Sequence, residues 1–352
     1  MITNWKFLLD ESVADPDDIA RAFGLDLEST KRVSKAYPVK INPYFLELAK
    51  DNGEALSRQV VPDIEELSPR NTACPKDPIM EEAYSPVTNL THRYRDRVLF
   101  LVSDTCPVHC RFCTRKRKVG KGLTITDETI DEGIKYIRGK PEIRDVLLSG
   151  GDPLLLEDDK LADILDRIRG ISHVEVIRIG TRVPGTLPQR VNEELARLLS
   201  RFHPLYIHTH FNHPAEITAE SSIACRILAD SGAPLSSQTV LLSGINDDAS
   251  TLETLFRSLL SLRVRPYYLF QSDMVRGSEH FRTPLESGIK IMETVRGRTS
   301  EMALPRFAVD LPEGRGKVVL DSGHIEDDGR GKVIVTTLEG EKVKYPDPAP
   351  SG

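Results

Sequence analysis

From Val98 onward, short apolar runs alternate with longer amphipathic segments. The short runs, rich in aliphatic and β-branched residues, predict strands at 98–103, 145–150, 174–181, 205–210, 237–243 and 266–271. The segments between them repeat apolar residues every three to four positions and predict helices at 125–137, 159–169, 192–199, 219–231, 249–262 and 288–297. This β/α alternation predicts a parallel sheet with right-handed crossovers, either open or closed into a complete or partial barrel. We expect its strands to be buried on both faces.

The two ends of the chain follow other patterns. Residues 1–90 contain short helical patterns broken by proline-rich stretches and predict a helical N-terminal extension. After Pro305 the chain is rich in glycine, and residues 331–345 predict a small β hairpin before a polar tail. We therefore expect three parts, with boundaries at 1–90, 91–310 and 311–352.

Composition excludes several classes of protein. The formal net charge of −6 leaves no global basic field for nucleic acid or an anionic membrane. The N-terminus lacks the apolar core of a signal peptide, and no apolar run reaches the roughly 18 residues of a membrane span. We expect a cytoplasmic protein, in which the isolated Cys74 and Cys225 are small buried residues.

The other three cysteines follow the first predicted strand directly. Cys106, Cys110 and Cys113 have C-x₃-C-x₂-C spacing, which allows one loop to surround a small metal centre. A tetrahedral zinc ion would need a fourth ligand, for which His109 is a candidate, whereas a four-iron cluster would keep one iron open. The basic run at 115–118 is either solvated or a nucleic-acid patch, although it lacks interleaved aromatic residues.

With Phe112 before its last cysteine, this loop resembles the hallmark of the radical S-adenosylmethionine (SAM) superfamily. The resemblance implies a partial (β/α)6 TIM-like barrel, a 4Fe-4S cluster, and reductive cleavage of S-adenosylmethionine to a 5′-deoxyadenosyl radical. It also implies a flavodoxin- or ferredoxin-type reductant. Gly150, Gly151 and Asp152 resemble the superfamily's glycine-rich segment that binds the methionine amino group, although such a short motif is also typical of a turn.

Several ordered stretches resemble the lysine 2,3-aminomutase family more narrowly. They are HRYRDRVLFLVSDTCPVHCRFCTRKR, RDVLLSGGDPLL, LPQRV, THFNHPAEIT, VRPYYLFQSD, HFRTPLESGI and FAVDLPEGRGK. That family moves the amino group of lysine from the α to the β carbon, using pyridoxal 5′-phosphate (PLP) and the deoxyadenosyl radical. The resemblance implies an isomerase that interconverts L-lysine and β-lysine.

The resemblance also implies which residues contact the cofactors. Lys317 matches the lysine that carries PLP until the substrate amine displaces it. The residues that match positions near the PLP phosphate are Arg93, Tyr94 and Arg97. His210 and Gln238 match positions that face the cofactors from inside the barrel and are expected to contact S-adenosylmethionine.

Substrate recognition is implied by three further matches. Arg115 matches the arginine that binds the substrate carboxylate, and a planar guanidinium suits that task. Asp273 and Asp310 match the two carboxylates that bind the distal ammonium group. A cation and an amide at those positions would instead favour a glutamate-type enzyme. Three alternatives remain. The same chemistry could act on arginine, or a radical enzyme could modify a protein or RNA. The third alternative is not an enzyme but an iron–sulfur or electron-transfer protein.

The chain departs from the zinc-containing members of this family. Where they carry a cysteine after the fifth strand, this chain has Asp248 in GINDDAS, and its tail KYPDPAPSG contains no cysteine. We therefore expect no structural zinc. The resemblance allows a homo-oligomer, but because structural zinc contributes to assembly, the oligomeric state of the zinc-containing members does not transfer to this chain.

Overall fold

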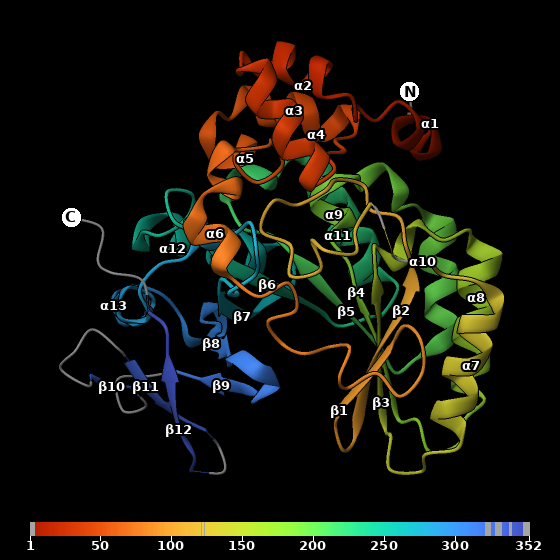
Figure 1. The fold of residues 1–352 in the computed structure, drawn as a ribbon. Helices are drawn as coiled ribbons and strands as arrows, with labels where there is room; N and C mark the ends of the chain where they lie inside the picture. Colours follow the sequence, from red (N-terminus) through yellow and green to blue (C-terminus); the bar gives the residue numbers. More distant parts are fainter. Residues whose placement is uncertain are drawn as a thin grey trace.

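The structure is a computed structural model that describes residues 4–120, 122, 124–320, 325–327, 333–337 and 340–347. A nine-stranded sheet forms its centre, and the strands follow one another in chain order (Figure 1). They are β1 (Leu90–Tyr94), β2 (Arg97–Ser103), β3 (Asp145–Gly150), β4 (Val176–Gly180), β5 (Leu205–His210), β6 (Leu235–Leu241), β7 (Val264–Gln271), β8 (Arg306–Asp310) and β9 (Lys317–Val319).

Strands β2 to β8 pair in parallel, while β1 and β9 are antiparallel at the two edges. In the described part of the chain the edge strands do not pair with each other, so the sheet is open. The two edge strands nevertheless lie close together: the backbone N–H of Lys317 in β9 donates to the hydroxyl of Tyr94 in β1 at 3.2 Å. This curved, open sheet confirms the prediction of a partial β/α barrel.

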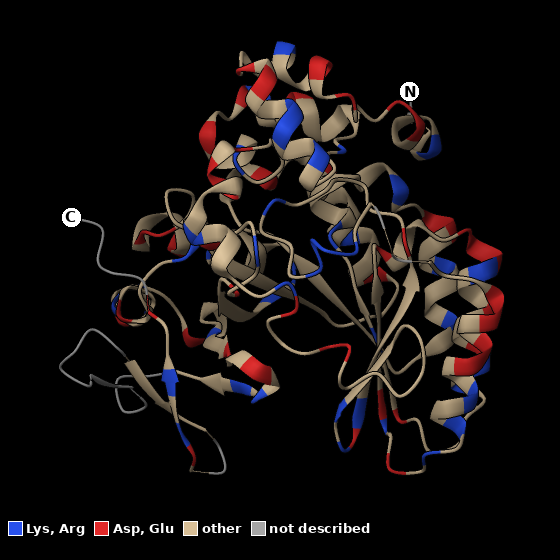
Figure 2. Cartoon of the chain, in the orientation of Figure 1, with Lys and Arg blue, Asp and Glu red and all other residues tan. Residues whose placement is uncertain are grey.

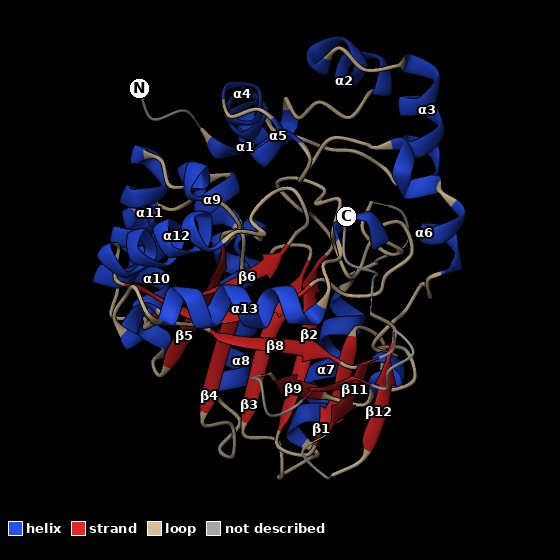
Figure 3. Ribbon diagram, turned by 90° about the vertical axis from the view of Figure 1, so that its left-hand side faces the viewer, coloured by secondary structure: helices blue, strands red, loops and turns tan. Residues whose placement is uncertain are grey.

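A helix follows each of the strands β2 to β7, as predicted, and lies outside the sheet (Figures 1 and 3). These helices are α7 (Asp127–Arg138), α8 (Asp158–Arg169), α10 (Glu193–Leu199), α11 (Ala219–Asp230), α12 (Ala249–Ser261) and α13 (Leu285–Arg296). Side-chain caps fix several of their starts: Thr126 and Thr218 form capping boxes, and Asp248 accepts from the backbone N–H of Thr251. Among the described residues no helix has the length and apolarity needed to cross a membrane.

Only one face of the sheet is fully buried. Along β5, Leu205, Ile207 and Thr209 are buried. The side chains of Leu205 and Ile207 pack in the hydrophobic core between the sheet and its helices. The alternate residues, Tyr206, His208 and His210, keep partial exposure on the opposite face. The expectation that both faces are buried is therefore wrong: helices cover the outer face, and the inner face carries polar side chains around an accessible interior.

The N-terminal extension is helical, as predicted, and covers the carboxyl ends of the parallel strands (Figure 1). Its helices are α1 (Trp5–Asp10), α2 (Pro16–Phe23), α3 (Leu27–Ala36), α4 (Pro43–Asp51), α5 (Glu54–Ser57) and α6 (Pro69–Ala73). The extension contacts the cysteine loop directly, since His109 N–H donates to the Lys40 carbonyl and Arg111 N–H to the Gln59 carbonyl, both at 2.8 Å. It therefore forms one wall around that loop.

A small antiparallel sheet lies beside β8 and β9 (Figure 1). Its strands are β10 (Ile325–Asp327), β11 (Val333–Thr336) and β12 (Lys342–Tyr345). The pair β11 and β12 confirms the predicted hairpin, and β10 adds a strand that the pattern did not predict. The end of the described chain is fixed to α13, because the Asp347 carboxylate accepts from the Leu285 N–H at 2.9 Å.

Candidate active site

The cysteine loop joins β2 to α7 at the carboxyl end of the sheet. Its three cysteines are half-buried, and each of Cys106 and Cys113 is close enough to another cysteine for that thiol to affect its pKa. Burial raises the pKa of Cys106 well above its usual range, and Cys113 and Cys110 raise it further. Burial and then Cys110 also raise the pKa of Cys113 to about 11. Thiols in this setting become thiolates when a metal replaces their protons, so the donor set fits an iron–sulfur cluster held by three cysteines.

The zinc interpretation of the loop finds no support in the contacts of His109. Its Nδ1 lies 3.1 Å from the Pro38 carbonyl in the N-terminal extension, and burial lowers its pKa to about 4. Across the described ranges, no three His, Cys, Asp or Glu side chains are grouped closely enough to hold a single metal ion. His109 therefore joins the loop to the extension.

The glycine-rich end of β3 packs against the start of the cysteine loop. A Cβ on Gly150, whose φ is +141°, would lie 2.1 Å from the Ser103 carbonyl oxygen, and one on Gly151 would lie 2.3 Å from that of Thr105. Only glycine permits this approach of two backbones. The Asp152 carboxylate is also engaged, since it accepts from the Thr181 hydroxyl at 2.8 Å and from the Arg182 N–H at 2.7 Å. The segment thus positions the loop, and its contact with S-adenosylmethionine stays a prediction.

Phe112 of the loop packs on the inner face of the sheet. Its ring centroid lies 5.6 Å from that of His210, whose Nε2 is 2.9 Å from Asn212 Oδ1. Burial and the nearby Arg182 lower the pKa of His210 to about 3, so this imidazole is neutral at physiological pH. Gln238 lies opposite His210 in the β5–β6 register. The structure therefore brings both predicted interior residues to the wall that continues from the loop.

Lys317 projects into the same interior from the opposite edge of the sheet. Its Nζ lies 4.2 Å from the ring centroid of Phe270 and 4.6 Å from that of Tyr268. Burial lowers the pKa of Lys317, an effect that Asp310 and Asp273 oppose. A lowered pKa makes the neutral, nucleophilic amine more accessible.

Two of the predicted phosphate-binding residues surround Tyr94. The guanidinium carbon of Arg97 lies 4.2 Å, and that of Arg93 5.3 Å, from the Tyr94 ring centroid. In the described structure the buried Nη2 of Arg93 has no hydrogen-bond partner, and an unpaired buried donor is costly. An anion bound beside Lys317 would accept a hydrogen bond from this Nη2 group of Arg93. These residues from β1, β2 and β9 therefore fit a phosphate-bearing cofactor.

Sequence reasoning missed other polar residues of the inner face. Arg178 Nε donates to Asp145 Oδ1 at 2.7 Å, and the buried Nε2 of His208 has no partner among the described residues. Burial, with Arg178 and Lys317, lowers the pKa of His208 to about 4. These residues could have been found in the sequence, because they are polar residues at every second position of otherwise apolar strands. Every second residue of a strand faces the same side of the sheet.

The two predicted ammonium-binding carboxylates lie close together. Burial and then the charge of Asp310 raise the pKa of Asp273 to about 7, while its contact with Thr114, whose hydroxyl donates to Oδ2 at 2.6 Å, opposes this rise. Asp310 pairs with Lys317 in the β8–β9 register. Two carboxylates that repel each other in a partly desolvated site favour a bound cation.

Arg115, the predicted carboxylate-binding residue, already has a carboxylate partner. Its Nε and Nη2 lie 2.8 and 2.7 Å from Glu81 Oε1, a residue of the N-terminal extension that sequence reasoning missed. Glu81 is buried and Arg115 retains 18% side-chain exposure. Its contact with a substrate stays a prediction.

Comparisons with known proteins agree with this site. The model of the Radical SAM superfamily matches residues 100–255, and the Lysine-2,3-aminomutase model matches residues 292–351. L-lysine 2,3-aminomutase from Clostridium subterminale is 42% identical over 98% of this chain and 84% of its own length. The chain belongs to the lysine 2,3-aminomutase family.

This family contains isomerases with different names. Glutamate 2,3-aminomutase from Clostridioides difficile is 40% identical over 98% of this chain and 82% of its own length. Among solved structures, a radical SAM methyltransferase from Sphaerobacter thermophilus aligns with 63% of this chain and 68% of its own, at 17% identity and a TM-score of 0.45. Membership of the radical SAM superfamily implies a 4Fe-4S cluster and S-adenosylmethionine.

In this family member the basic run after the cysteines is mostly paired, not solvated. Lys116 Nζ donates to Glu66 Oε2 at 2.6 Å, as does Arg111 Nη2, and all three side chains are buried. Arg117 lies within 3.2 Å of three carboxylates of the extension, those of Asp77, Glu81 and Glu82. The interpretations of this run as solvated or as a nucleic-acid patch are wrong for Lys116 and Arg117. Figure 2 shows charges of both signs mixed over the outer helices.

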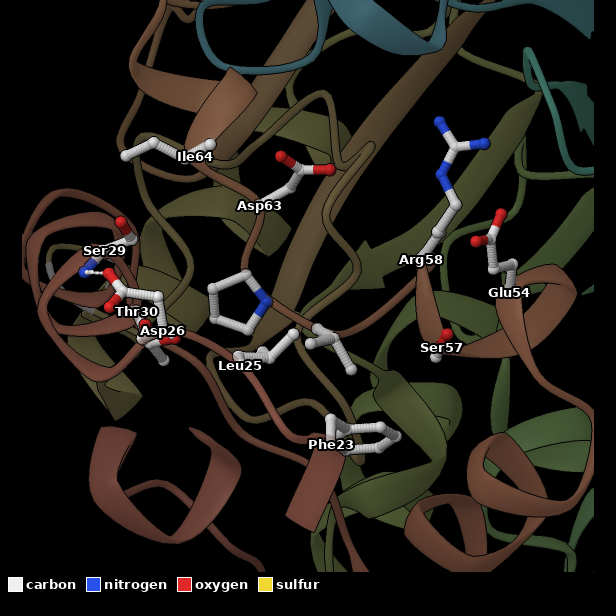
Figure 4. A pocket seen from close by; sticks show the side chains of 12 residues that line it. Phe23, Leu25, Asp26, Ser29, Thr30, Glu54, Ser57, Arg58, Asp63 and Ile64 are labelled. Atoms are coloured by element: carbon white, nitrogen blue, oxygen red, sulfur yellow. Dashed lines mark hydrogen bonds between the residues drawn. The ribbon is translucent and has the colours of Figure 1, made fainter. Parts of the chain in front are cut away.

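The isolated cysteines are buried, as predicted: Cys74 is 6% and Cys225 0% exposed. A cavity of about 620 Å³ lies elsewhere in this aminomutase-family chain, within the N-terminal extension. Phe23, Asp26 and Asp63 are among its lining residues (Figure 4). None of the residues that line it belongs to the cysteine loop or to the inner face of the sheet, so it is not the site described above.

Proposed function

We propose that this chain is a PLP-dependent radical aminomutase that interconverts L-lysine and β-lysine by moving the amino group between the α and β carbons. The observation that carries this proposal is the carboxylate pair, Asp273 and Asp310, beside Lys317. The named relatives include a lysine and a glutamate aminomutase, and these substrates differ in the charge of the distal group. Two carboxylates attract an ammonium group and repel a carboxylate, so the pair favours lysine.

The residues at hand fit the cofactors that this reaction needs. Cys106, Cys110 and Cys113 would hold the cluster, Lys317 would hold PLP, and Arg93 would bind its phosphate. When bound, the cluster with S-adenosylmethionine supplies a hydrogen-abstracting carbon radical, and PLP holds the migrating amino group.

The chain's own residues bind and orient the substrate in this proposal. Asp273 and Asp310 bind the distal ammonium, and Thr114 orients Asp273 through its 2.6 Å hydrogen bond. Arg115 binds the α-carboxylate at the other end while Glu81 holds its guanidinium in place. Fixing both ends of a flexible substrate restricts the carbons between them, which is the main contribution of a positioning site.

The test is an anaerobic turnover assay. The chain is reconstituted with iron, sulfide and PLP, reduced with dithionite, and given S-adenosylmethionine with L-lysine, L-arginine or L-glutamate in separate reactions. Products are separated by chiral chromatography and identified by mass spectrometry. β-Lysine from the lysine reaction alone is the expected result. β-Glutamate as the main product would overturn the assignment of the carboxylate pair, and β-arginine as the main product would replace lysine with arginine as the substrate.

A matched variant separates the substrate assignment from the radical chemistry. Asp273→Asn should reduce β-lysine formation while S-adenosylmethionine is still cleaved, because the side-chain oxygen of asparagine can still accept from the hydroxyl of Thr114 and so leaves the adjacent Cys113 in place. Absence of cleavage in wild-type protein with a verified cluster would contradict the catalytic proposal itself.

A further inference from the structure

Arg182 contacts one cysteine of the loop directly. The residue lies where β4 ends and α9 (Val183–Thr186) begins, and its Nη1 donates to Cys110 Sγ at 2.8 Å. Within the described structure, Cys110 is the one cysteine of the three whose sulfur accepts a hydrogen bond from a side chain. The three predicted cluster ligands are therefore not equivalent.

Several elements hold the Arg182 side chain in this position. Its Nη2 donates to Gln59 Oε1 at 2.5 Å and to Glu216 Oε2 at 3.1 Å, and its backbone N–H donates to Asp152 Oδ2 at 2.7 Å. Its guanidinium carbon lies 5.6 and 5.2 Å from the ring centroids of Phe45 and Phe112. Because the extension, β3, β5 and the cysteine loop all contribute, the donor is fixed before any cofactor binds.

The charges around this donor are screened little by water. The Arg182 side chain is 8% exposed and that of Glu216 is fully buried. Glu216 offsets part of the positive charge, but it contacts Nη2 and not the Nη1 that donates to Cys110, and the backbone N–H groups of Asn212 and His213 hold its other oxygen, Oε1. The Nη1 group that donates to Cys110 is therefore not shared with Glu216.

A donor at this sulfur discriminates between two oxidation states. Reduction by one electron adds one negative charge to a cluster, and hydrogen bonds to ligand sulfurs are among the factors that set cluster potentials. A fixed cationic donor stabilises the more negative, reduced form more strongly than the oxidised form.

We propose that Arg182 is a positioning residue that raises the reduction potential of the cluster through its hydrogen bond to Cys110. The affected step is the transfer of one electron from a low-potential one-electron donor, of flavodoxin or ferredoxin type, to the cluster. The donor is oxidised by one electron, the cluster is reduced by one, and no bond forms or breaks at Arg182. This inference rests on the proposed function only in requiring that the three cysteines hold a cluster.

The experiment compares midpoint potentials of reconstituted proteins. The variants are Arg182→Gln, Arg182→Lys and the double variant Arg182→Gln with Glu216→Gln, and the control is Arg190→Gln. Arg190 is also a buried arginine, but it donates to the Leu154 carbonyl and Asp158 instead of a cysteine. Iron and sulfide are quantified first, and the reduced cluster is then followed by electron paramagnetic resonance during an anaerobic redox titration without S-adenosylmethionine.

Arg182→Gln should lower the ratio of reduced to oxidised cluster at a given potential by roughly tenfold, as expected for a hydrogen bond from a charged donor. This corresponds to about 59 mV for one electron. Arg182→Lys, which keeps the charge but not the planar fork, should shift the potential less in the same direction and keeps the test valid if the glutamine variant fails to fold. Arg190→Gln should match the wild type.

The double variant separates the hydrogen bond from the net charge. It removes one charge of each sign, so a potential that stays low supports the hydrogen bond, and a return to the wild-type value would overturn it. Equal potentials in Arg182→Gln and wild type would also overturn the inference, even if the variant bound S-adenosylmethionine more weakly. A wild type that binds no iron would instead contradict the proposed function, so the two failures are distinguishable.

Discussion

Replacing Asp273 with asparagine should weaken lysine binding and stabilise the fold at the same time. The carboxylate has a pKa of about 7, against an ordinary value of 3.8, because burial and Asp310 disfavour its charge. This difference corresponds to at most about 4 kcal/mol of destabilisation when Asp273 is ionised. Asp273 is only half-buried, so we discount the value for solvent screening and expect a gain of about 2 kcal/mol at pH 8.

The sign of the pH dependence follows from proton linkage. Between pH 4 and pH 7 the folded chain keeps a proton on Asp273 that the unfolded chain releases, so this residue makes stability fall as pH rises through that window. The gain from Asp273→Asn should therefore be largest at pH 8 and shrink to about a quarter of that value near pH 4.5. Urea unfolding of the cofactor-free chain at both pH values measures it.

Lysine binding should change in the opposite direction. Losing one of two carboxylates around an ammonium group costs about 2 kcal/mol, or roughly thirtyfold in Kd. In the wild type, binding should tighten as pH rises towards 7, because the carboxylate must ionise to receive the ammonium group. Equilibrium dialysis of the PLP-loaded protein without S-adenosylmethionine measures both effects.

The matched control is Asp248→Asn, an exposed helix cap where asparagine also serves. It should change neither lysine affinity nor stability at pH 8. An unchanged Kd for lysine in Asp273→Asn, or a loss of stability at pH 8, would refute the reasoning.

Three further substitutions test other parts of the site. Lys317→Ala should abolish borohydride-fixed PLP, detected by peptide mass spectrometry, whereas the exposed control Lys344→Ala should be labelled like the wild type. Arg93→Gln should weaken PLP binding by about 2 kcal/mol, roughly thirtyfold by absorbance titration, and equal affinity would remove Arg93 from the phosphate site. Glu66→Gln should cost about 3–5 kcal/mol in urea unfolding because two buried cations lose their carboxylate, and a cost below about 1 kcal/mol would contradict that network.

Elements with a regular pattern were predicted well. The six β/α repeats were all found because short apolar runs alternate along the chain with longer segments whose apolar residues have the helical period. The strand β8 was missed, although it carries Asp310, because its apolar run, residues 307–309, is shorter than the four to eight residues that indicate a buried strand. The hairpin was found through its turn and alternating pattern, whereas β10 was not.

Some residues of the site are neighbours in the sequence, and others are far apart in it. The sequence by itself determined the cysteine loop, since three thiolates within eight positions can converge without help from the rest of the fold. It also determined the β/α order that brings strand ends to one edge of the sheet.

Only the tertiary structure decided which distant charges meet. Arg182 reaches Cys110, Glu81 pairs with Arg115, and the basic run finds its carboxylates in the N-terminal extension. Curvature of the sheet brings β9 back to β1, which places Lys317 beside Tyr94. These contacts depend on strand register and on how the extension packs against the sheet. The spacing of residues along the chain encodes neither, because residues far apart in the sequence meet only after the chain between them has folded.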